Sequence, residues 1–267
     1  MSTIQEAANT AEFPLFIPFI MAGDPTPEAT VDTALALQEA GAHILELGIP
    51  YSDPLADGPV IQAAAIRALK GGMTLSNALD LIPQMREKGV TIPIVVFTYY
   101  NPLLQLGVEG FSATAAEKGA NGLLVPDLPL EESDEVKEAA NRHDLSLISL
   151  VAPTSKERVD RIVEQAEGFL YIVSSLGVTG SRDAFHEQTH SFVEEVTQKA
   201  QVPAAVGFGV SKPEHVRALK GKTDGVIVGS AIVSLMGKLT NELKGEEHER
   251  KQALGEVKKF VHQLIAE

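Results

Sequence analysis

The chain has 267 residues, of which 44% are hydrophobic, and carries a formal net charge of −14. This charge argues against nucleic acid and anionic membranes as main partners, although backbone N–H groups can still bind a small anion. The sequence has no cysteine, which excludes a disulfide framework and a thiolate nucleophile and suits a reducing compartment. No apolar run reaches the roughly 18 residues of a membrane span, and Met1 to Phe13 lacks a signal-peptide pattern, so we expect a cytoplasmic protein.

Short apolar runs alternate with helical patterns along almost the whole chain. Near-continuous apolar runs are typical of strands in a parallel sheet. The predicted strands are Leu15–Ala22, His43–Ile49, Ile92–Tyr99, Gly122–Asp127, Leu145–Ala152, Phe169–Ser175, Pro203–Phe208 and Gly225–Val228. The predicted helices are Glu28–Ala40, Val60–Lys70, Leu75–Lys88, Gly110–Lys118, Glu131–Arg142, Lys156–Glu167, Ser191–Ala200, Pro213–Leu219 and Glu246–Ile265.

Eight strands that are each followed by helix predict an α/β fold, a single (β/α)₈ TIM barrel over residues 1–267. The rival fold is a doubly wound open sheet. It usually has fewer strands, and no dinucleotide-binding glycine fingerprint follows the first strand.

A carboxylate stands inside the second predicted strand. Side chains alternate along a strand, so Ile44, Glu46 and Gly48 share one face while Leu45 and Leu47 share the other. In a barrel the leucines pack against helices, and Glu46 points into the lumen near the rim where barrel active sites lie. A lone buried Glu is either a proton-transfer group or a structural group bonded to a nearby hydroxyl, and for Glu46 alone the two interpretations weigh equally.

Asp57, in the turn-rich loop after this strand, favours catalysis. Two acids beside one pocket can divide the roles of acid and base. Asp57 is otherwise a turn residue, because Asp-Gly is a common turn pair. For Asp53, which precedes Pro54, an interface or loop-stiffening role is favoured over catalysis.

Three glycine-bearing loops, 176–181, 206–211 and 228–232, follow the last three predicted strands. Barrel enzymes often bind phosphate in the loops after strands seven and eight together with a short helix. Gly207 and Gly209 let the backbone approach an anion, and Gly229 and Ser230 open a segment whose amides can cap it. Tight turns alone are the alternative, but three such loops in the expected places favour a phosphate site.

Other residues give weaker signals. Phe19, Phe97, Tyr99 and Tyr171 lie on predicted strands and can line an aromatic ligand pocket, although any one alone is more often core. The seven histidines show no metal-ligand spacing, so we expect no metal.

These segments resemble the tryptophan synthase α subunit family over roughly Phe16 to Val233. The matching motifs are Pro18–Pro25, Leu45–Pro59, Gly177–Gly180, Gly207–Gly209 and Gly229–Ala231. The signature around the second strand is long and highly specific, whereas the phosphate loops alone fit several barrel families.

The resemblance implies a retro-aldol cleavage of indole-3-glycerol phosphate to indole and glyceraldehyde 3-phosphate, without cofactor or metal. It implies that Glu46 and Asp57 are catalytic. The implied phosphate-binding residues are Gly180, Phe208, Gly209, Gly229 and Ser230, the implied indole pocket contains Phe19, Phe97, Tyr99, Pro126 and Tyr171, and Thr179 lies in an implied mobile loop. It also implies a tryptophan synthase β subunit as partner in an α2β2 heterotetramer, which would convert the indole to L-tryptophan.

Two alternatives stay open at this point. One is another phosphate-binding barrel enzyme that acts on a related indole or sugar phosphate, and the other is a stand-alone indole-producing lyase. A synthase that makes indole-3-glycerol phosphate is expected to carry a pocket lysine, and the predicted strands contain none. A non-catalytic activator of a β subunit is disfavoured because both acids are present.

Overall fold

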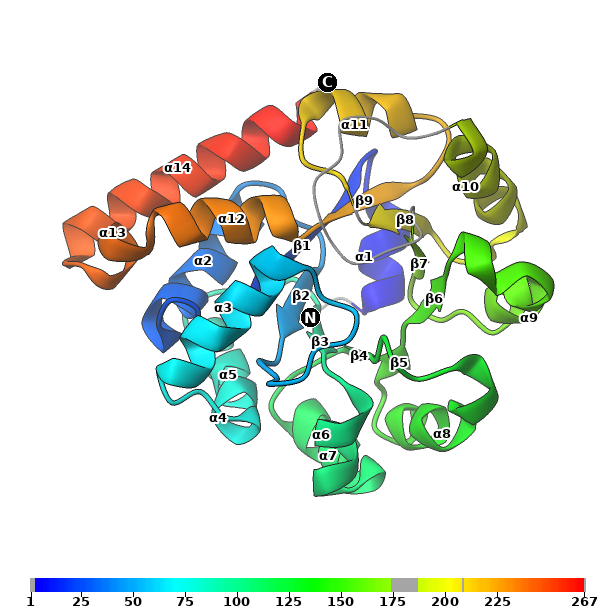
Figure 1. The fold of residues 1–267 in the computed structure, drawn as a ribbon, viewed down its shortest axis with the longest axis horizontal. Helices are drawn as coiled ribbons and strands as arrows, with labels where there is room; N and C mark the ends of the chain where they lie inside the picture. The colour runs from blue at the N-terminus through cyan, green and yellow to red at the C-terminus, as the bar shows by residue number, and fades with distance from the viewer. Residues whose placement is uncertain (1–2, 174–186, 208, 267) are drawn as a thin grey trace.

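The computed structural model of the chain describes residues 3–173, 187–207 and 209–266. In this part of the chain nine strands form one parallel sheet, in the order β5-β4-β3-β2-β1-β9-β8-β7-β6. They are β1 (Leu15–Met21), β2 (Leu45–Gly48), β3 (Ile94–Phe97), β4 (Gly122–Leu124), β5 (Ser146–Leu147), β6 (Ser149–Val151), β7 (Leu170–Val173), β8 (Ala204–Gly207) and β9 (Gly225–Val228). The two outermost strands, β5 and β6, are consecutive in the chain, so the sheet curls into a nearly closed barrel (Figure 1). The predicted TIM barrel is confirmed.

The extra strand comes from the predicted strand Leu145–Ala152, which the structure divides at Ile148. Its first part, β5, pairs with β4, and its second part, β6, pairs with β7. The N–H of Ile148 still bonds to Leu123 of β4, at 2.8 Å. One segment therefore joins both ends of the sheet, and the short break lets it change partner.

Helices surround the barrel (Figure 1). The α-helices are α1 (Ile4–Thr10), α2 (Pro27–Glu39), α3 (Pro59–Lys70), α4 (Leu75–Leu79), α5 (Leu81–Glu87), α6 (Tyr100–Leu106), α7 (Val108–Glu117), α8 (Asp134–Arg142), α9 (Val159–Glu164), α10 (Glu187–Lys199), α11 (Pro213–Leu219), α12 (Ser230–Lys238), α13 (Thr240–Lys244) and α14 (Glu247–Ile265), and two 3₁₀ turns are η1 (Leu130–Glu132) and η2 (Pro153–Arg158). Among these described helices, none is long and apolar enough to cross a membrane.

The predicted helix Leu75–Lys88 is wrong as a single helix, because α4 ends at Leu79 and α5 starts at Leu81. Pro83 explains the break, since a proline has no N–H to bond the carbonyl four residues earlier and its ring clashes there. The helices α1, α6, α12 and α13 were not among the predicted helices.

The helix α1 closes the amino-terminal mouth of the barrel. Thr3 and Glu6 form a reciprocal capping box at its start, with hydrogen bonds of 3.1 and 2.8 Å. Ile4 is buried against Gly122 and Gly168, where an added Cβ would lie 2.7 Å from Ile4 atoms in both cases. A ligand site inside the barrel therefore has to open at the other end.

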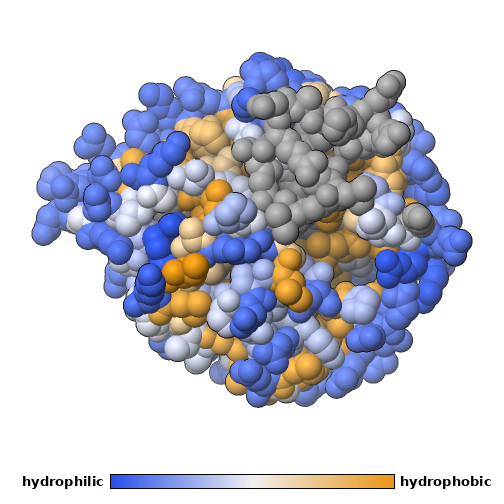
Figure 2. Space-filling view, in the orientation of Figure 1, coloured by the Kyte–Doolittle hydropathy of each residue, from blue (hydrophilic) through white to orange (hydrophobic). Residues whose placement is uncertain are grey.

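The core has two parts, as the alternation along the strands predicts. Leu45 and Leu47 of β2 belong to the large cluster between the sheet and the helices. Ile44 belongs to a smaller cluster inside the lumen, together with Ile17, Val95 and Ile227. The parity of β2 that directs Glu46 inward is thus confirmed. On the outside, Figure 2 shows hydrophobic side chains near the middle of one face with hydrophilic ones around its edge.

Candidate active site

Glu46 lies in the lumen on β2, between Phe19 of β1 and Val95 of β3. The residue is 1% exposed, and its Oε1 has no hydrogen-bond partner among the described residues. Burial raises the pKa of Glu46 to about 8, because desolvation disfavours the carboxylate. At neutral pH Glu46 is therefore mostly protonated and can donate a proton.

Asp57 reaches the same lumen from the loop between β2 and α3. Burial raises the pKa of Asp57 to about 6, and a hydrogen bond with the Tyr99 hydroxyl acts in the opposite direction. The same hydroxyl accepts the N–H of Ala56 at 3.1 Å. Asp57 is thus mostly ionised at neutral pH while Glu46 holds its proton, and such a difference in pKa separates an acid from a base.

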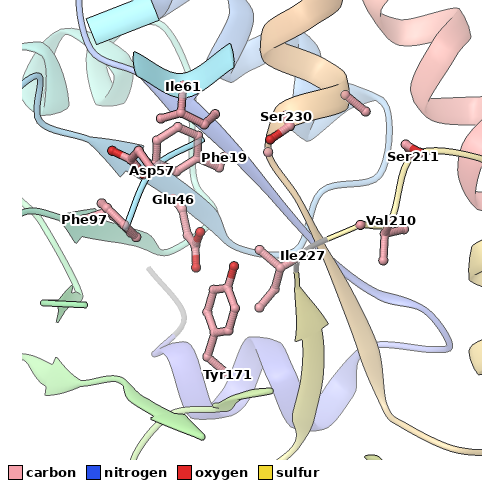
Figure 3. A pocket seen from close by; sticks show the side chains of 13 residues that line it. Phe19, Glu46, Asp57, Ile61, Phe97, Tyr171, Val210, Ser211, Ile227 and Ser230 are labelled. Atoms are coloured by element: carbon pink, nitrogen blue, oxygen red, sulfur yellow. The ribbon is translucent and has the colours of Figure 1, made fainter. Parts of the chain in front are cut away.

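The two acids line one cavity of about 570 Å³, a volume that includes space open to solvent. Figure 3 shows the Tyr171 hydroxyl pointing toward the Glu46 carboxyl group. The pKa of Tyr171 is raised well above its usual value, first by burial and then by the charges of Glu46 and Asp57. The phenol therefore stays neutral beside the acids.

Aromatic and aliphatic side chains form the wall around the acids. Phe19 and Phe97 meet edge to face, with ring centroids 5.4 Å apart. Gly48 makes room for them, because a Cβ there would lie 2.4 Å from the Phe19 ring. Ile61 of α3 and Ile227 of β9 complete an apolar surface that suits a planar aromatic ligand.

Phe19, Phe97 and Tyr171 line the cavity, as expected for an indole pocket, but two other expected residues lie elsewhere. Tyr99 is 2% exposed and lies behind Asp57, with its ring centroid 5.4 Å from that of Tyr51. The reason is that β3 ends at Phe97 and Tyr99 is the N-cap residue of α6, so the strand alternation stops before it. Pro126 lines a separate depression beside the ends of β4 and β6.

Glycines and a helix start form the side of the cavity that lies away from Asp57 and Phe97 (Figure 3). Gly209, Gly229 and Ser230 all line it, as expected for the phosphate-binding residues. Gly209 has φ +96°, a conformation that favours glycine. The first N–H groups of α12 have no partner within their helix and no side-chain cap from Gly229, so they present a positive end to an anion. The expected residues Thr179, Gly180 and Phe208 lie outside the described part of the chain.

Five further residues line the cavity: Ile61, Val210, Ser211, Ile227 and Ala231. Val210, Ser211 and Ala231 belong to the glycine-bearing loops 206–211 and 228–232, so their place in these loops was the available signal. Ile61 carried no such signal. Within the described residues, no group of three His, Cys, Asp or Glu side chains could hold a metal ion.

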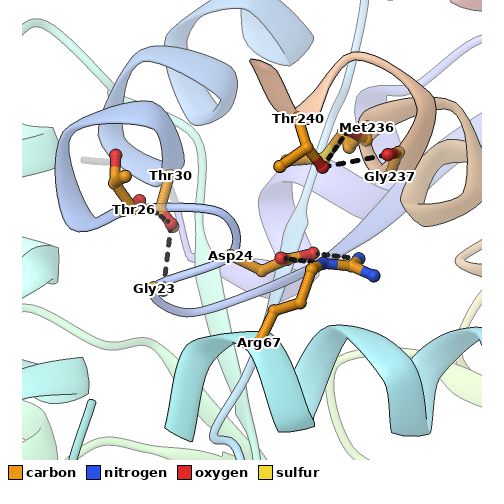
Figure 4. A network of polar contacts seen from close by, with 8 residues as sticks. All are labelled: Gly23, Asp24, Thr26, Thr30, Arg67, Met236, Gly237 and Thr240. Atoms are coloured by element: carbon orange, nitrogen blue, oxygen red, sulfur yellow. Dashed lines mark hydrogen bonds and ion pairs between the residues drawn. The ribbon is translucent and has the colours of Figure 1, made fainter. Parts of the chain in front are cut away.

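The helix after the Asp57 loop is anchored by a partly buried ion pair (Figure 4). Arg67 of α3 donates from Nε and Nη2 to the two carboxylate oxygens of Asp24, at 2.7 and 2.8 Å. Asp24 is 2% exposed and follows β1. This bidentate contact ties the last turn of α3, the helix that follows the Asp57 loop, to the segment after β1.

Comparisons with known proteins identify the relatives of this chain. A family model described as tryptophan synthase alpha chain matches residues 5–262. The tryptophan synthase alpha chain of Geobacillus stearothermophilus is 60% identical over 253 residues, which cover 95% of this chain and 94% of that one. The corresponding protein of Bacillus subtilis is 53% identical, with 92% of each chain covered. A chain from the tryptophan synthase α2β2 complex of Pyrococcus furiosus superimposes with a TM-score of 0.84 at 39% identity, covering 94% of this chain and 98% of that chain.

Proposed function

The chain belongs to the tryptophan synthase alpha chain family, and we propose that its cavity cleaves indole-3-glycerol phosphate into indole and glyceraldehyde 3-phosphate. The reaction is a carbon–carbon lyase step of the retro-aldol type. The observation that carries this proposal is one apolar cavity that holds two buried acids, with the pKa of Glu46 near 8 and the pKa of Asp57 near 6.

The two acids divide the proton transfers. Glu46 donates its proton to the indole carbon that bears the side chain, and the positive charge that spreads to the ring N–H is stabilised by the Asp57 carboxylate. The carbon–carbon bond then breaks and its electrons return to the ring. The adjacent hydroxyl becomes the aldehyde by giving its proton to Glu46, which restores the acid.

Two ends of the cavity hold the two ends of the substrate. The indole ring packs against Phe19 and Phe97, and the phosphate meets the backbone at Gly209, Gly229 and Ser230. The start of α12 supports this assignment, because helix N-termini attract anions. Anchoring both ends places the scissile bond beside Glu46.

We also propose a tryptophan synthase β subunit as partner, in an α2β2 complex that receives the indole. The described P. furiosus neighbour comes from such a complex. Leu55 of the Asp57 loop is 80% exposed, and Leu104 and Leu106 of α6 are 47% and 51% exposed. The Asn101 amide donates to the Tyr51 hydroxyl at 3.0 Å, which links α6 to this loop. A partner that covers these leucines would steady the loop that carries Asp57.

The proposal is tested by incubating the purified chain with indole-3-glycerol phosphate, alone and with a cognate β subunit. Indole and glyceraldehyde 3-phosphate should form in equal amounts, slowly for the isolated chain and faster in the complex. Absence of both products in the complex contradicts the proposed reaction. Cleavage that does not respond to the β subunit, with no complex in sedimentation, makes the chain a stand-alone lyase. A cytoplasmic location is part of the proposal, since a chain without cysteine suits a reducing compartment.

A further inference from the structure

A buried histidine that does not line the cavity contacts the segment that does. His215, in the first turn of α11, is 5% exposed. Its Nδ1 lies 2.9 Å from the carbonyl oxygen of Gly209 and 3.3 Å from the backbone nitrogen of Ser211. Gly209 and Ser211 both line the cavity, at the end that carries the start of α12. His215 is therefore placed to set the shape of the cavity wall without touching a ligand.

The two contacts of Nδ1 need opposite tautomers. With its proton on Nδ1 the ring donates to the Gly209 carbonyl, and with its proton on Nε2 the ring accepts the N–H of Ser211. One of the two bonds is available in either neutral form, so the segment 209–211 stays tied to α11. In the tautomer with its proton on Nδ1, the ring bonds the Gly209 carbonyl from behind the cavity wall, which keeps this electronegative oxygen from an anion in the cavity.

The side chain of Ser211 offers a hydroxyl group to a ligand in the cavity. Its Oγ is buried in the cavity wall and has no hydrogen-bond partner among the described residues. A buried hydroxyl without a partner is unfavourable, so such a group is commonly satisfied by a ligand or by water. The backbone of Ser211 is the part that His215 contacts, so the histidine also sets where this hydroxyl lies.

We propose that His215 is a positioning residue for phosphate binding, acting through Gly209 and Ser211. This inference rests on the proposed function for the identity of the natural ligand, an organic phosphate. Both contacts with the segment 209–211 are made by Nδ1 of His215, so a replacement side chain has to place a polar atom at the position of Nδ1. An asparagine at this position places its amide where Nδ1 lies, whereas a glutamine places its amide near Nε2.

The experiment compares His215→Asn, His215→Gln and His215→Leu with the wild-type chain. His43→Leu is the matched control, because Nδ1 of His43 accepts the N–H of Phe16 at 3.1 Å, before β2 and away from the cavity. For each protein the dissociation constants of inorganic phosphate and of indole are measured by calorimetry. The kcat and KM for indole-3-glycerol phosphate are measured with the β subunit present.

The Leu and Gln variants should bind inorganic phosphate about tenfold more weakly and raise KM by a similar factor, as the loss of one hydrogen bond predicts. Their kcat and indole affinity should stay close to the wild-type values, and His215→Asn and His43→Leu should bind phosphate normally. Unchanged phosphate affinity in His215→Gln overturns the inference, and so does an equal loss of phosphate and indole affinity. If His215→Leu does not fold, the Asn and Gln pair decides. A wild-type chain that binds phosphate but cleaves no substrate contradicts the proposed reaction, while the phosphate series still tests His215.

Discussion

The hydroxyl of Tyr99 hydrogen-bonds to the side chain of Asp57 and accepts the backbone N–H of the preceding residue, Ala56. Tyr99 is the N-cap residue of α6, whereas Asp57 lies in the loop after β2. One phenol therefore fixes both the position and the charge of a proposed catalytic acid, although it lies outside the cavity.

Replacing Tyr99 by Phe should move the acidic limb of the pH–rate profile to higher pH. The Tyr99 hydrogen bond lowers the pKa of Asp57, against burial that raises it to about 6. Without the bond the pKa rises further, so Asp57 loses its charge at a higher pH as the solution is acidified. The profile of kcat/KM against pH measures this shift. Tyr51→Phe is the control, because the Tyr51 hydroxyl bonds to Asn101 instead. Equal profiles for Tyr99→Phe and wild type would contradict the role of this bond.

Glu46→Gln and Asp57→Asn should each lower the cleavage rate by about 10²–10⁴-fold, the usual contribution of a general acid or base. Both changes keep the shape of the side chain, so circular dichroism should show a normal fold. Asp53→Asn is the control from the same loop, since Asp53 is exposed and bonds to Ser52. Near-normal turnover of either acid variant in the isolated chain would remove that residue from the proposed mechanism.

The contribution of Glu46 to the stability of the chain should fall as the pH rises from about 5 to 9. Burial raises the pKa of folded Glu46 to about 8 from an ordinary value of 4.5. The folded state thus holds this proton more tightly than the unfolded state, and the associated stability is complete below the unfolded pKa and lost as pH rises through the folded pKa. Each unit of difference between the folded and unfolded pKa values corresponds to about 1.4 kcal/mol in the free energy of unfolding. Denaturant titrations of wild type and Glu46→Gln should diverge with rising pH, with the Gln variant losing less. Parallel curves would show that Glu46 is not desolvated.

Gly209→Val should weaken the binding of a phosphate ligand sharply. Gly209 has φ +96°, and a side chain there would project into open space at the phosphate end of the cavity. Gly221→Val is a matched control, because Gly221 has φ +76°, also faces open space and lies before β9 at the other end of the barrel. Both variants carry backbone strain, so both should unfold more easily, but only Gly209→Val should lose ligand affinity in calorimetry. Equal ligand affinities in the two variants would argue against a phosphate site at Gly209.

Arg67→Met should destabilise the chain more than Asp24→Asn. Asp24 is 2% exposed and would keep a buried charge without its partner, whereas the Arg67 side chain is 31% exposed and can turn to water. Leaving a buried charge unpaired is unfavourable by about 3–5 kcal/mol, which is the loss expected for Arg67→Met. Asp24→Asn should cost less, because the unpaired Arg67 side chain is partly exposed to water. Lys251→Met removes the exposed pair with Glu247 and should leave the free energy of unfolding nearly unchanged, because solvent screens exposed ion pairs. Similar losses in the free energy of unfolding for all three variants would show that the Asp24–Arg67 pair contributes no more than an exposed pair.

Local patterns in the sequence determined the strands, most of the helices and the direction of Glu46. A strand has a period of two, so the six residues from Ile44 to Ile49 suffice to place Glu46 opposite Leu45 and Leu47. The glycines at 209 and 229 were likewise identifiable, because close approach and positive φ require a particular residue type. The long motif around β2 identified the family for the same reason, since it is a contiguous segment.

Only the tertiary structure decided which side chains share the cavity. Tyr99 and Pro126 carry the right residue types for an aromatic pocket, yet one supports Asp57 from behind and the other faces a separate depression. Asp24 pairs with Arg67, which is far from it in the sequence, and no local pattern specifies that pair. No local pattern specifies the orientation of the His215 ring toward Gly209 either. The pKa of Glu46 and the pKa of Asp57 also depend on the fold, because desolvation is set by every group packed around a carboxyl and not by its neighbours along the chain.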